Sequence, residues 1–501
     1  MNEARRACAQ HRAAAALVAA GLALACLPDG ARAAERSAVL YDGSDGATCD
    51  YFNYGARIAW RHRRGDWIDA RRAEQGTAPF AKIDVRPGDE TKTLRIDVTG
   101  LYAAAGATPA GVHGLLLRLL PGSESGAVQF HSREAASPGL RPSLVVDYAD
   151  GKSARLPATA DSTLDCSTFT SLGEQPVTGV SSTQHAVLRF NPATRVARAT
   201  LELSVARTFG PSSVGVYALD PLRDDAGEPA RAGIAARYPR DQGIERDPAV
   251  IMATGFEEFR WQAPWSHVDF RSEVDRVGKP GRRGFEPLVG QALEVGIPAG
   301  KHLGMDVRYR FADAGTEPDE VYFRYYLRFA SDWDPKTEGG KLPGISATYS
   351  SAGWGGRKAD ADKGWSMRGL FLRPPATGNP FQGGTPIGTY AYHADMETDY
   401  GDNWTWSAGG RGVLERNRWY CIEQYVKVNQ PGRKDGVLRA WVDGHLVLEK
   451  SGIRLRDSAS LHIEQIWMNV YYGGLDVAPS DMHLFIDNVV VARDYIGPMR
   501  P

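Results

Sequence analysis

Cysteine, long apolar runs and net charge are all scarce in this chain. Its 501 residues include 5 cysteines and carry a formal net charge of -1. A chain this close to neutral has no overall field that would hold nucleic acid or a membrane surface, so we expect neither as a partner. An acidic polymer would have to be met by a local basic patch.

Several short catalytic motifs are also missing. The chain has no H-E-x-x-H, C-x-x-C, G-x-S-x-G or P-loop pattern, which removes the main sequence support for metalloprotease, redox, esterase and nucleotide chemistry. We therefore expect no metal and no cofactor, and we expect a monomer.

The N-terminus carries the one pronounced apolar run. Three arginines within the first 12 residues precede "AAAALVAAGLALACL", and "ARAAERS" follows. This basic, apolar, small-residue order predicts a secretory signal peptide over 1–34 and a secreted or periplasmic protein. A lipoprotein anchored through Cys26 is the alternative. An oxidising compartment would allow a Cys49–Cys166 bridge, which the sequence leaves open.

Strand patterns fill the rest of the chain. Short alternating runs are broken by Gly, Pro, Asp and Asn, and no long helical periodicity is present, so we predict an all-β protein. Runs such as "TLRIDVTGLY" and "RATLELSV" predict one or more β-sandwich modules over 36–220. The charged, Gly- and Pro-containing stretch 221–245 is interpreted as a linker, which leaves 246–501 as a second, β-sandwich domain.

The N-terminal region resembles a known module. "GDWIDA" (65–70), "PFAKIDV" (79–85), "IDVTGLY" (96–102) and "FHSREAASPGLRPSLVVDY" (130–148) are similar to the DNRLRE type of β-sandwich, which accompanies many secreted carbohydrate-active enzymes. The resemblance implies either polysaccharide binding or a spacer, and both remain open.

In the C-terminal region the period of two separates a core face from a polar face in each strand. In "VYFRYYLRF" the core face is Val321, Phe323, Tyr325, Leu327 and Phe329. The polar, aromatic and basic positions are interpreted as one shared concave surface that binds substrate. These positions are Arg324, Tyr326, Ser366, Arg368, Tyr390, Tyr392, Glu423, Tyr425, Lys427, Asn469 and Tyr471.

One lysine stands out beside this surface. Lys341 lies in "GGKLPG" (339–344), where glycine and proline predict a shaped loop. Between Lys341 and Arg373 there are six basic residues (Lys341, Arg357, Lys358, Lys363, Arg368, Arg373) and two acidic ones (Asp360, Asp362), a local balance of +4. This balance favours an anionic ligand.

Six ordered motifs carry a second resemblance. "GGKLPG", "WSMR" (365–368), "YAYHAD" (390–395), "RWYCIEQYVKVN" (418–429), "MNVYYGG" (468–474) and "FIDNVVV" (485–491) are similar to polysaccharide lyase family fourteen, the β-jelly-roll lyases of alginate and related polyuronates. The resemblance implies a concanavalin A-like sandwich that cleaves an acidic polysaccharide, with catalytic residues Lys341, Ser366, Arg368, Tyr390 and Tyr392. The connection 374–388 is longer than that family leads us to expect, and we interpret it as a lid.

The chemistry of β-elimination suits these residue types. Removal of the uronate C5 proton builds negative charge beside a carboxylate, which cations and hydrogen-bond donors stabilise. Arg368 offers a planar fork for that carboxylate, and a tyrosine close to cations can transfer the proton. A lectin and a glycosidase remain as alternatives. A glycosidase would need two flanking carboxylates, for which Glu397, Asp399, Asp402 and Glu423 are candidates.

Overall fold

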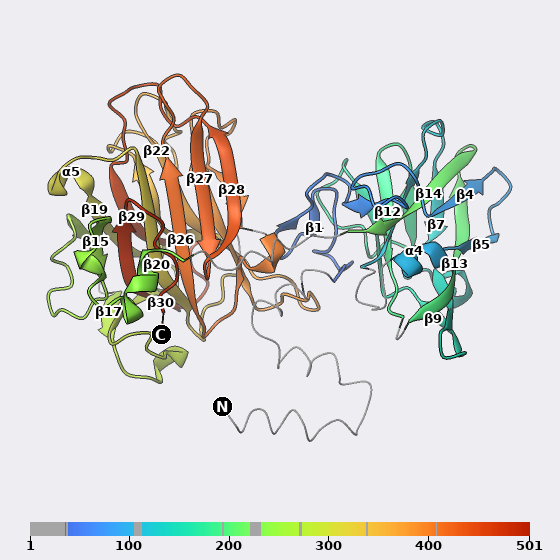
Figure 1. Ribbon diagram of the computed structural model, residues 1–501, viewed down its shortest axis with the longest axis horizontal. Coiled ribbons are helices and arrows are strands. Elements are labelled where there is room, and N and C mark those ends of the chain that lie inside the picture. The colour runs from blue at the N-terminus through green and yellow to red at the C-terminus, as the bar shows by residue number, and fades with distance from the viewer. Residues whose placement is uncertain are drawn as a thin grey trace.

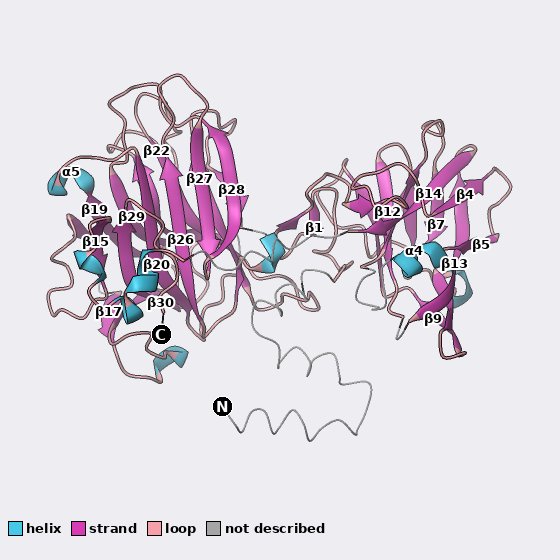
Figure 2. Ribbon diagram, viewed as in Figure 1, coloured by secondary structure: helices cyan, strands magenta, loops and turns pink. Residues whose placement is uncertain are grey.

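The computed structural model describes residue 36 and residues 39–104, 113–192, 195–220, 232–269, 273–336, 339–406 and 408–500. The predicted signal peptide and the first part of the predicted linker, 221–231, lie outside these ranges. Within the described residues, no helix combines the length and the apolar character needed to cross a membrane. Strands dominate the regular structure, as predicted, and they form two β-sandwiches (Figures 1 and 2).

The N-terminal sandwich consists of two six-stranded antiparallel sheets. The first sheet contains β3 (Trp67–Ile68), β4 (Ala81–Val85), β6 (Leu115–Leu119), β10 (Ala160–Asp165), β12 (Gln184–Arg189) and β14 (Ser212–Leu219). The second contains β5 (Thr93–Asp97), β7 (Val128–His131), β8 (Ser143–Tyr148), β9 (Ser153–Pro157), β11 (Val177–Val180) and β13 (Val196–Thr208). Helix α4 (Thr99–Ala104) and the 3-10 turn η2 (Pro138–Leu140) complete it. Both sheets share one core, so the described part of the region is a single module.

Alternation along β13 shows how the sequence specifies this core. Ala199, Leu201, Leu203 and Val205 are fully buried, while the residues between them point to the other face. Successive side chains of a strand point to opposite faces, so apolar residues at every second position all lie on the same face, and that face packs into the core. The two-residue periodicity therefore fixes which side of the strand packs inward.

A small hairpin precedes the first sheet. It is formed by β1 (Tyr51–Asn53) and β2 (Ile58–Ala59), and β1 lies between the two sandwiches in Figure 1. Cys49, directly before β1, is disulfide-bonded to Cys166 at the end of β10. The pairing that the sequence left open is therefore present, and it ties the hairpin to the sandwich. Cys421 is free and buried.

The C-terminal sandwich has two eight-stranded antiparallel sheets. The β20 sheet contains β15 (Val250–Thr254), β17 (Val274–Val277), β18 (Ala292–Ile297), β20 (Glu320–Phe329), β26 (Trp419–Lys427), β27 (Gly436–Val442), β28 (His445–Ile453) and β30 (Met482–Ala492). The β22 sheet contains β16 (His267–Asp269), β19 (Leu303–Arg310), β21 (Gly339–Ala347), β22 (Trp365–Leu372), β23 (Thr385–Tyr392), β24 (Asp402–Thr405), β25 (Val413–Leu414) and β29 (Gln465–Tyr472). Short helical pieces are η3 (Ile234–Arg237), η4 (Pro239–Asp241), η5 (Ile244–Arg246), η6 (Arg282–Gly284), α5 (Phe311–Ala314) and η7 (Ala408–Gly410).

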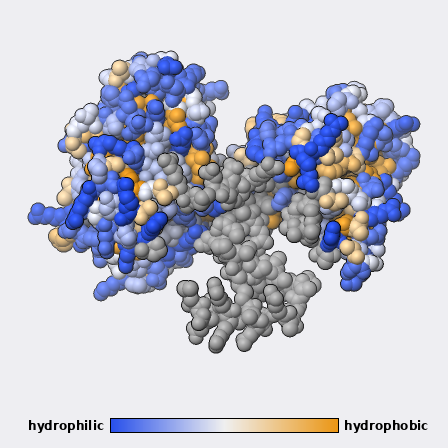
Figure 3. All heavy atoms as spheres, in the orientation of Figure 1, coloured by the Kyte–Doolittle hydropathy of each residue, from blue (hydrophilic) through white to orange (hydrophobic). Residues whose placement is uncertain are grey.

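The predicted core face of β20 is confirmed. Val321, Phe323, Tyr325, Leu327 and Phe329 all belong to the large cluster between the two sheets. The Asp-Gly turn between β27 and β28 also forms, with φ of 52° at Asp443 and 80° at Gly444, as a two-residue hairpin requires. The surface seen in Figure 3 is mostly hydrophilic over both sandwiches, with hydrophobic residues in small groups.

The linker prediction is wrong for its second part. From 232 onward the chain packs on the β20 sheet, where Ile234 and Ile244 are buried against Val490 and Ile496. Asp241 forms an ion pair with Arg324 of β20. Short 3-10 turns carry no long apolar period, so the sequence pattern of a folded, charged segment resembled that of a linker.

The connection 374–388, interpreted from the sequence as a lid, instead joins the two sandwiches. Asn379 and Asn53 exchange side-chain hydrogen bonds of 2.9 and 3.0 Å while both are buried. Phe381 is 1% exposed and packs in a cluster with Phe52 and Trp60 of the N-terminal module. These contacts hold the module against the side of the β22 sheet.

Candidate active site

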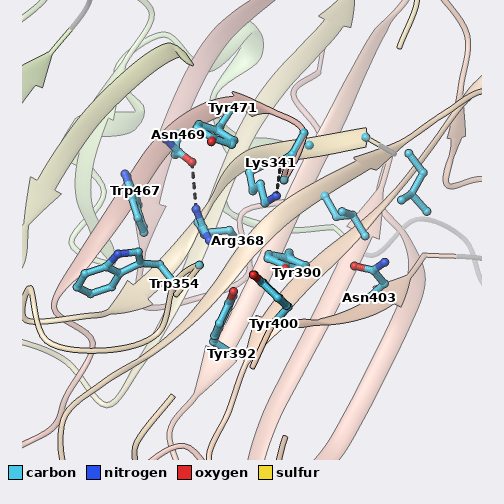
Figure 4. A pocket seen from close by; sticks show the side chains of 18 of the residues that line it. Lys341, Trp354, Arg368, Tyr390, Tyr392, Tyr400, Asn403, Trp467, Asn469 and Tyr471 are labelled. Carbon is cyan, nitrogen blue, oxygen red and sulfur yellow. Dashed lines mark hydrogen bonds between the residues drawn. The ribbon is translucent and has the colours of Figure 1, made fainter. Parts of the chain in front are cut away.

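A cleft of about 920 Å³ lies on the outer face of the β22 sheet. Its polar and aromatic lining is Arg57, Asp306, Lys341, Trp354, Arg368, Tyr390, Tyr392, Tyr400, Asn403, Trp467, Asn469 and Tyr471. Most of these side chains come from neighbouring strands β29, β21, β22, β23 and β24, and they converge as Figure 4 shows. Three of the charged lining residues are cationic and one is anionic, which suits an anionic ligand.

Lys341 lies on a strand and not on the predicted loop. β21 is a central strand whose register shifts between Leu342 and Ile345, and its glycines allow close approach of the neighbours. A Cβ at Gly340 would lie 2.1 Å from the Tyr471 carbonyl oxygen. The Lys341 Nζ donates a 2.7 Å hydrogen bond to the Gly473 carbonyl and lies 4.7 Å from the centre of the Tyr390 ring. The lysine is thus held over a tyrosine in the cleft.

Arg368 is a buried cation without a carboxylate partner among the described residues. One of its Nη atoms donates a 3.2 Å hydrogen bond to the Asn469 Oδ1, and its Nε has no partner. Its guanidinium stacks 4.6 Å from the Trp467 ring centre. Burial lowers the pKa of Arg368, and the nearby tyrosines oppose this change. A buried charge that is not neutralised is costly, so this position favours a ligand that brings a negative charge.

The one carboxylate in the cleft lining is already neutralised. Asp306 accepts hydrogen bonds from the Arg308 Nε at 2.9 Å and from the Trp467 Nε1 at 2.9 Å. Arg308 offsets the charge of Asp306, and the hydrogen bond to Asp306 fixes the orientation of the Trp467 indole. Asp306 therefore contributes little negative charge to oppose an anionic ligand at Arg368.

The two predicted tyrosines are adjacent on β23 and both line the cleft. Their rings pack edge to face with centroids 5.3 Å apart. Tyr392 is fully buried, its hydroxyl lacks a hydrogen-bond partner of normal geometry, and burial raises its pKa, with the Tyr390 hydroxyl adding to the rise. The expectation that cations favour its phenolate is therefore wrong for Tyr392, because desolvation outweighs Arg368. Tyr392 holds its proton, and the half-buried Tyr390 is the more accessible of the two.

Ser366 occupies the predicted strand but not the cleft lining. Its side chain is fully buried, and its hydroxyl donates a 2.6 Å hydrogen bond to the Gly353 carbonyl. Gly355 and Gly356, which follow in the same loop, do line the cleft. Ser366 thus holds the loop that forms one wall of the cleft.

Besides the catalytic candidates Ser366, Arg368, Tyr390 and Tyr392, the predicted polar surface holds seven residues. Asn469 and Tyr471 lie in the cleft, and the other five lie on the β20 sheet. Arg324 pairs with Asp241, Tyr326 accepts a hydrogen bond from the Met499 amide, and Tyr425 donates one to Glu320. Glu423 accepts from the amides of Ile496 and Gly497, and Lys427 is exposed on the same strand as Glu423. The period of two identified a polar face correctly, but it belongs to the sheet that the C-terminal tail covers.

Sequence reasoning missed several lining residues. Trp467 lies on the same face of β29 as Asn469 and Tyr471, so the period of two could have identified it. Trp354 and Tyr400 lie in loops, where no period applies. Arg57 comes from the N-terminal module, and only the packing of the two sandwiches brings it to the cleft.

One group of carboxylates in the described residues has the spacing of metal ligands. Oxygens of Asp42, Glu134 and Asp161 lie within 4.8 Å of one another in the N-terminal module. Arg133 forms ion pairs with Asp42 at 2.8 Å and with Glu134 at 3.0 Å. The arginine offsets part of the negative charge of this cluster. The predicted glycosidase candidate Asp402 pairs with His393.

Comparisons with known proteins give one family match and several similar solved structures. No curated protein matches the chain. Similar solved structures include an alginate lyase of the PL-14 family from Aplysia kurodai, with 18% identity, a TM-score of 0.38 and coverage of 48% of this chain and 98% of that one. Another is the alginate lyase vAL-1 from Chlorella virus, with 17% identity, a TM-score of 0.36 and coverage of 48% and 99%. A third is the endo-beta-1,4-glucuronan lyase of Trichoderma reesei, with 14% identity, a TM-score of 0.31 and coverage of 48% and 95%.

The family comparison has a defined residue range. That range includes every lining residue named above except Arg57. It spans the strands that carry Lys341, Arg368 and both tyrosines. Residues 296–488 match the family model Polysaccharide lyase 14, so this part of the chain is similar to that family.

Proposed function

We propose that the protein cleaves a polyuronate of the alginate or glucuronan type by β-elimination. The observation that supports this most directly is Arg368, a buried guanidinium that hydrogen-bonds Asn469 and has no carboxylate partner among the described residues. A uronate carboxylate would supply the missing negative charge, and a guanidinium binds a carboxylate through two parallel hydrogen bonds. The family match of this domain agrees with that chemistry.

The reaction needs a proton acceptor at C5 and a proton donor at O4. With the carboxylate neutralised by Arg368 and Asn469, the charge that develops as the C5 proton leaves is stabilised. Tyr390, whose ring contacts the Lys341 ammonium, takes the C5 proton after its own hydroxyl proton has passed to solvent. The C4–O4 bond then breaks, a C4–C5 double bond forms, and O4 receives a proton from Tyr392 or Lys341, which both line the cleft.

A glycosidase fits this cleft less well. Hydrolysis uses a pair of carboxyl groups on either side of the bond, whereas the described lining contains Asp306 alone, already bound to Arg308. The predicted candidate Glu423 lies on the β20 sheet. A lectin would use the aromatic lining but would leave the unpaired Arg368 and the tyrosine pair without a role.

The test is a panel of polymannuronate, polyguluronate and polyglucuronate incubated with the protein. A lyase produces an unsaturated uronate, which absorbs in the ultraviolet, and a glycosidase produces new reducing ends without that absorbance. Binding without either product would identify a lectin. Product sizing on the best substrate would then distinguish internal from terminal cleavage.

Two further proposals concern the rest of the chain. We infer that the protein is secreted or periplasmic, which the order of residues in 1–34 and the Cys49–Cys166 disulfide support. The N-terminal sandwich is proposed to be a DNRLRE-type module, on the strength of its sequence motifs.

A further inference from the structure

The N-terminal module reaches the cleft through its β1–β2 hairpin. Arg57, in the turn of this hairpin, is part of the cleft lining. Its carbonyl oxygen accepts a 3.4 Å hydrogen bond from Thr405 Oγ1 at the end of β24. Because β24 is the last strand of its sheet, the hairpin closes the cleft at that end.

The Arg57 side chain has no carboxylate partner among the described residues. Its guanidinium lies 3.9 Å from the ring centre of Tyr54 and 6.0 Å from that of Tyr51. Neighbouring arginines of the module differ, since Arg61 pairs with Asp220 and Arg63 with Asp50. The two aromatic rings hold Arg57 in place and leave its hydrogen-bond donors for a ligand.

The hairpin is fixed against the catalytic domain. Next to it, the Ala376 amide donates a 2.7 Å hydrogen bond to Asp45, and Asn379 joins Asp45 and Asn53. The Arg57 backbone is left-handed, with φ of 58°, a conformation that is uncommon outside glycine and is maintained by surrounding structure. The guanidinium is thus positioned before any ligand binds.

We propose that Arg57 forms a subsite for a second carboxylate of the acidic polymer, so that the cleft is completed by the N-terminal module. This inference rests on the proposed function, because it takes the polymer to be a polyuronate with a carboxylate on each sugar. Arg368 lies on β22 and Arg57 beyond β24, and the two strand spacings from β22 to β24 alone amount to roughly 10 Å. One chain that binds Arg368 therefore places a more distant carboxylate at Arg57.

The test compares Arg57→Ala, Arg57→Lys and Arg64→Ala in the full chain. Arg64 is a matched control because it also has a left-handed backbone, with φ of 69°, and it donates to Ser182 and does not line the cleft. Each variant is assayed on polymannuronate, polyguluronate and polyglucuronate, and on a ladder of their oligomers from the disaccharide upward. We expect Arg57→Ala to raise KM for polymer about five- to tenfold, as for a partly exposed charged contact, with a smaller change in kcat.

The dependence on oligomer length is the decisive reading. KM should rise more for long oligomers than for short ones in Arg57→Ala, Arg57→Lys should recover part of the loss, and Arg64→Ala should behave as wild type. An equal change at all lengths, or no change, overturns the subsite. If wild type releases no unsaturated product, the proposed function fails by itself. Calorimetric binding of the same oligomers then tests Arg57 separately, with weaker binding of only the long ones supporting the subsite and equal binding overturning it.

Discussion

The Arg324 guanidinium and the Asp241 carboxylate form an ion pair in which the two side chains are 0% and 7% exposed. Arg324 lies on β20, whereas Asp241 belongs to the segment before the catalytic sandwich. Asn488 also donates a 3.0 Å hydrogen bond to Asp241. The catalytic domain therefore begins structurally at about 232, where the described chain resumes, and not at 246.

Removal of Asp241 should destabilise the catalytic domain. Asp241→Ala leaves a buried guanidinium unpaired, for which a loss of about 3–5 kcal/mol in the free energy of unfolding is typical. Hydrogen exchange of β20 and β26 in the full chain measures this loss, with Asp435→Ala, an exposed carboxylate near Arg433, as control. A chain starting at 246 should show the same weakness relative to one starting at 232. Equal exchange in Asp241→Ala and wild type would contradict the role of the pair.

Lys341→Ala and Arg368→Ala should lower kcat on the best polyuronate. Both cations face the place where charge develops, and loss of one such group costs about 2–4 kcal/mol of transition-state stabilisation. Steady-state kinetics measure the effect. Lys363→Ala is the control, because Lys363 is exposed and pairs with Asp360 outside the cleft. A rise in KM alone, with kcat unchanged, would show that both residues bind the substrate but do not stabilise the transition state.

Tyr390→Phe and Tyr392→Phe separate proton transfer from stacking. Phenylalanine keeps the ring and removes the hydroxyl, so we expect at least one variant to lose about a hundredfold or more in kcat, the lower range for general acid-base catalysis. The Tyr392 hydroxyl has no partner of normal geometry, so its removal should leave the melting temperature unchanged. Wild-type rates in both folded variants would remove the tyrosines from the proposed chemistry.

The disulfide should matter to both stability and substrate binding. Cys49 and Cys166 are 117 residues apart, and a closed loop of that order stabilises a domain by about 5 kcal/mol in the chain-entropy model. The double variant Cys49→Ser with Cys166→Ser should unfold earlier in urea. Because Cys49 adjoins the hairpin of Arg57, KM for polymer should rise as well. The single variant Cys421→Ser, at the free cysteine, is the control for loss of a thiol.

Asp161 should make the N-terminal module less stable as pH rises. Burial raises the pKa of Asp161 from 3.8 to about 8. The folded state therefore holds a proton that the unfolded state releases, and this stabilisation is complete below about 4 and is lost as pH rises through about 8. Calorimetric melting across this range should show a decline that Asp161→Asn flattens. A decline of the same size in Asp161→Asn would show that other groups cause it.

Local sequence pattern predicted the strand faces but could not assign them to sheets. The inward residues of β20 follow directly from alternation, and so does the polar face that carries Arg324. Whether such a face is covered depends on residues distant in sequence, here Asp241 and the C-terminal tail. Alternation has no information about those contacts.

The residues of the cleft were predictable where a family motif or the strand period applied. Lys341, Arg368, Tyr390, Tyr392, Asn469 and Tyr471 were all predicted and all line the cleft. The conformation at Lys341 was not predictable, because glycine and proline mark loops more often than central strands. Here the glycines allow three strands to approach closely. Arg57 required knowledge of how the sandwiches pack.

The buried amide pair of Asn53 and Asn379 also bears on how such a protein can be recombined. The hydrogen bonds between the two side-chain amides form only when both sandwiches carry the matching asparagine. A buried amide without its partner is destabilising. A chimera that exchanges the N-terminal module would lose this pair and the arginine beside the cleft at the same time. With the proposed Arg57 subsite, both halves would contribute to polymer binding, and a substitute module would have to preserve the docking contacts before it could alter that binding.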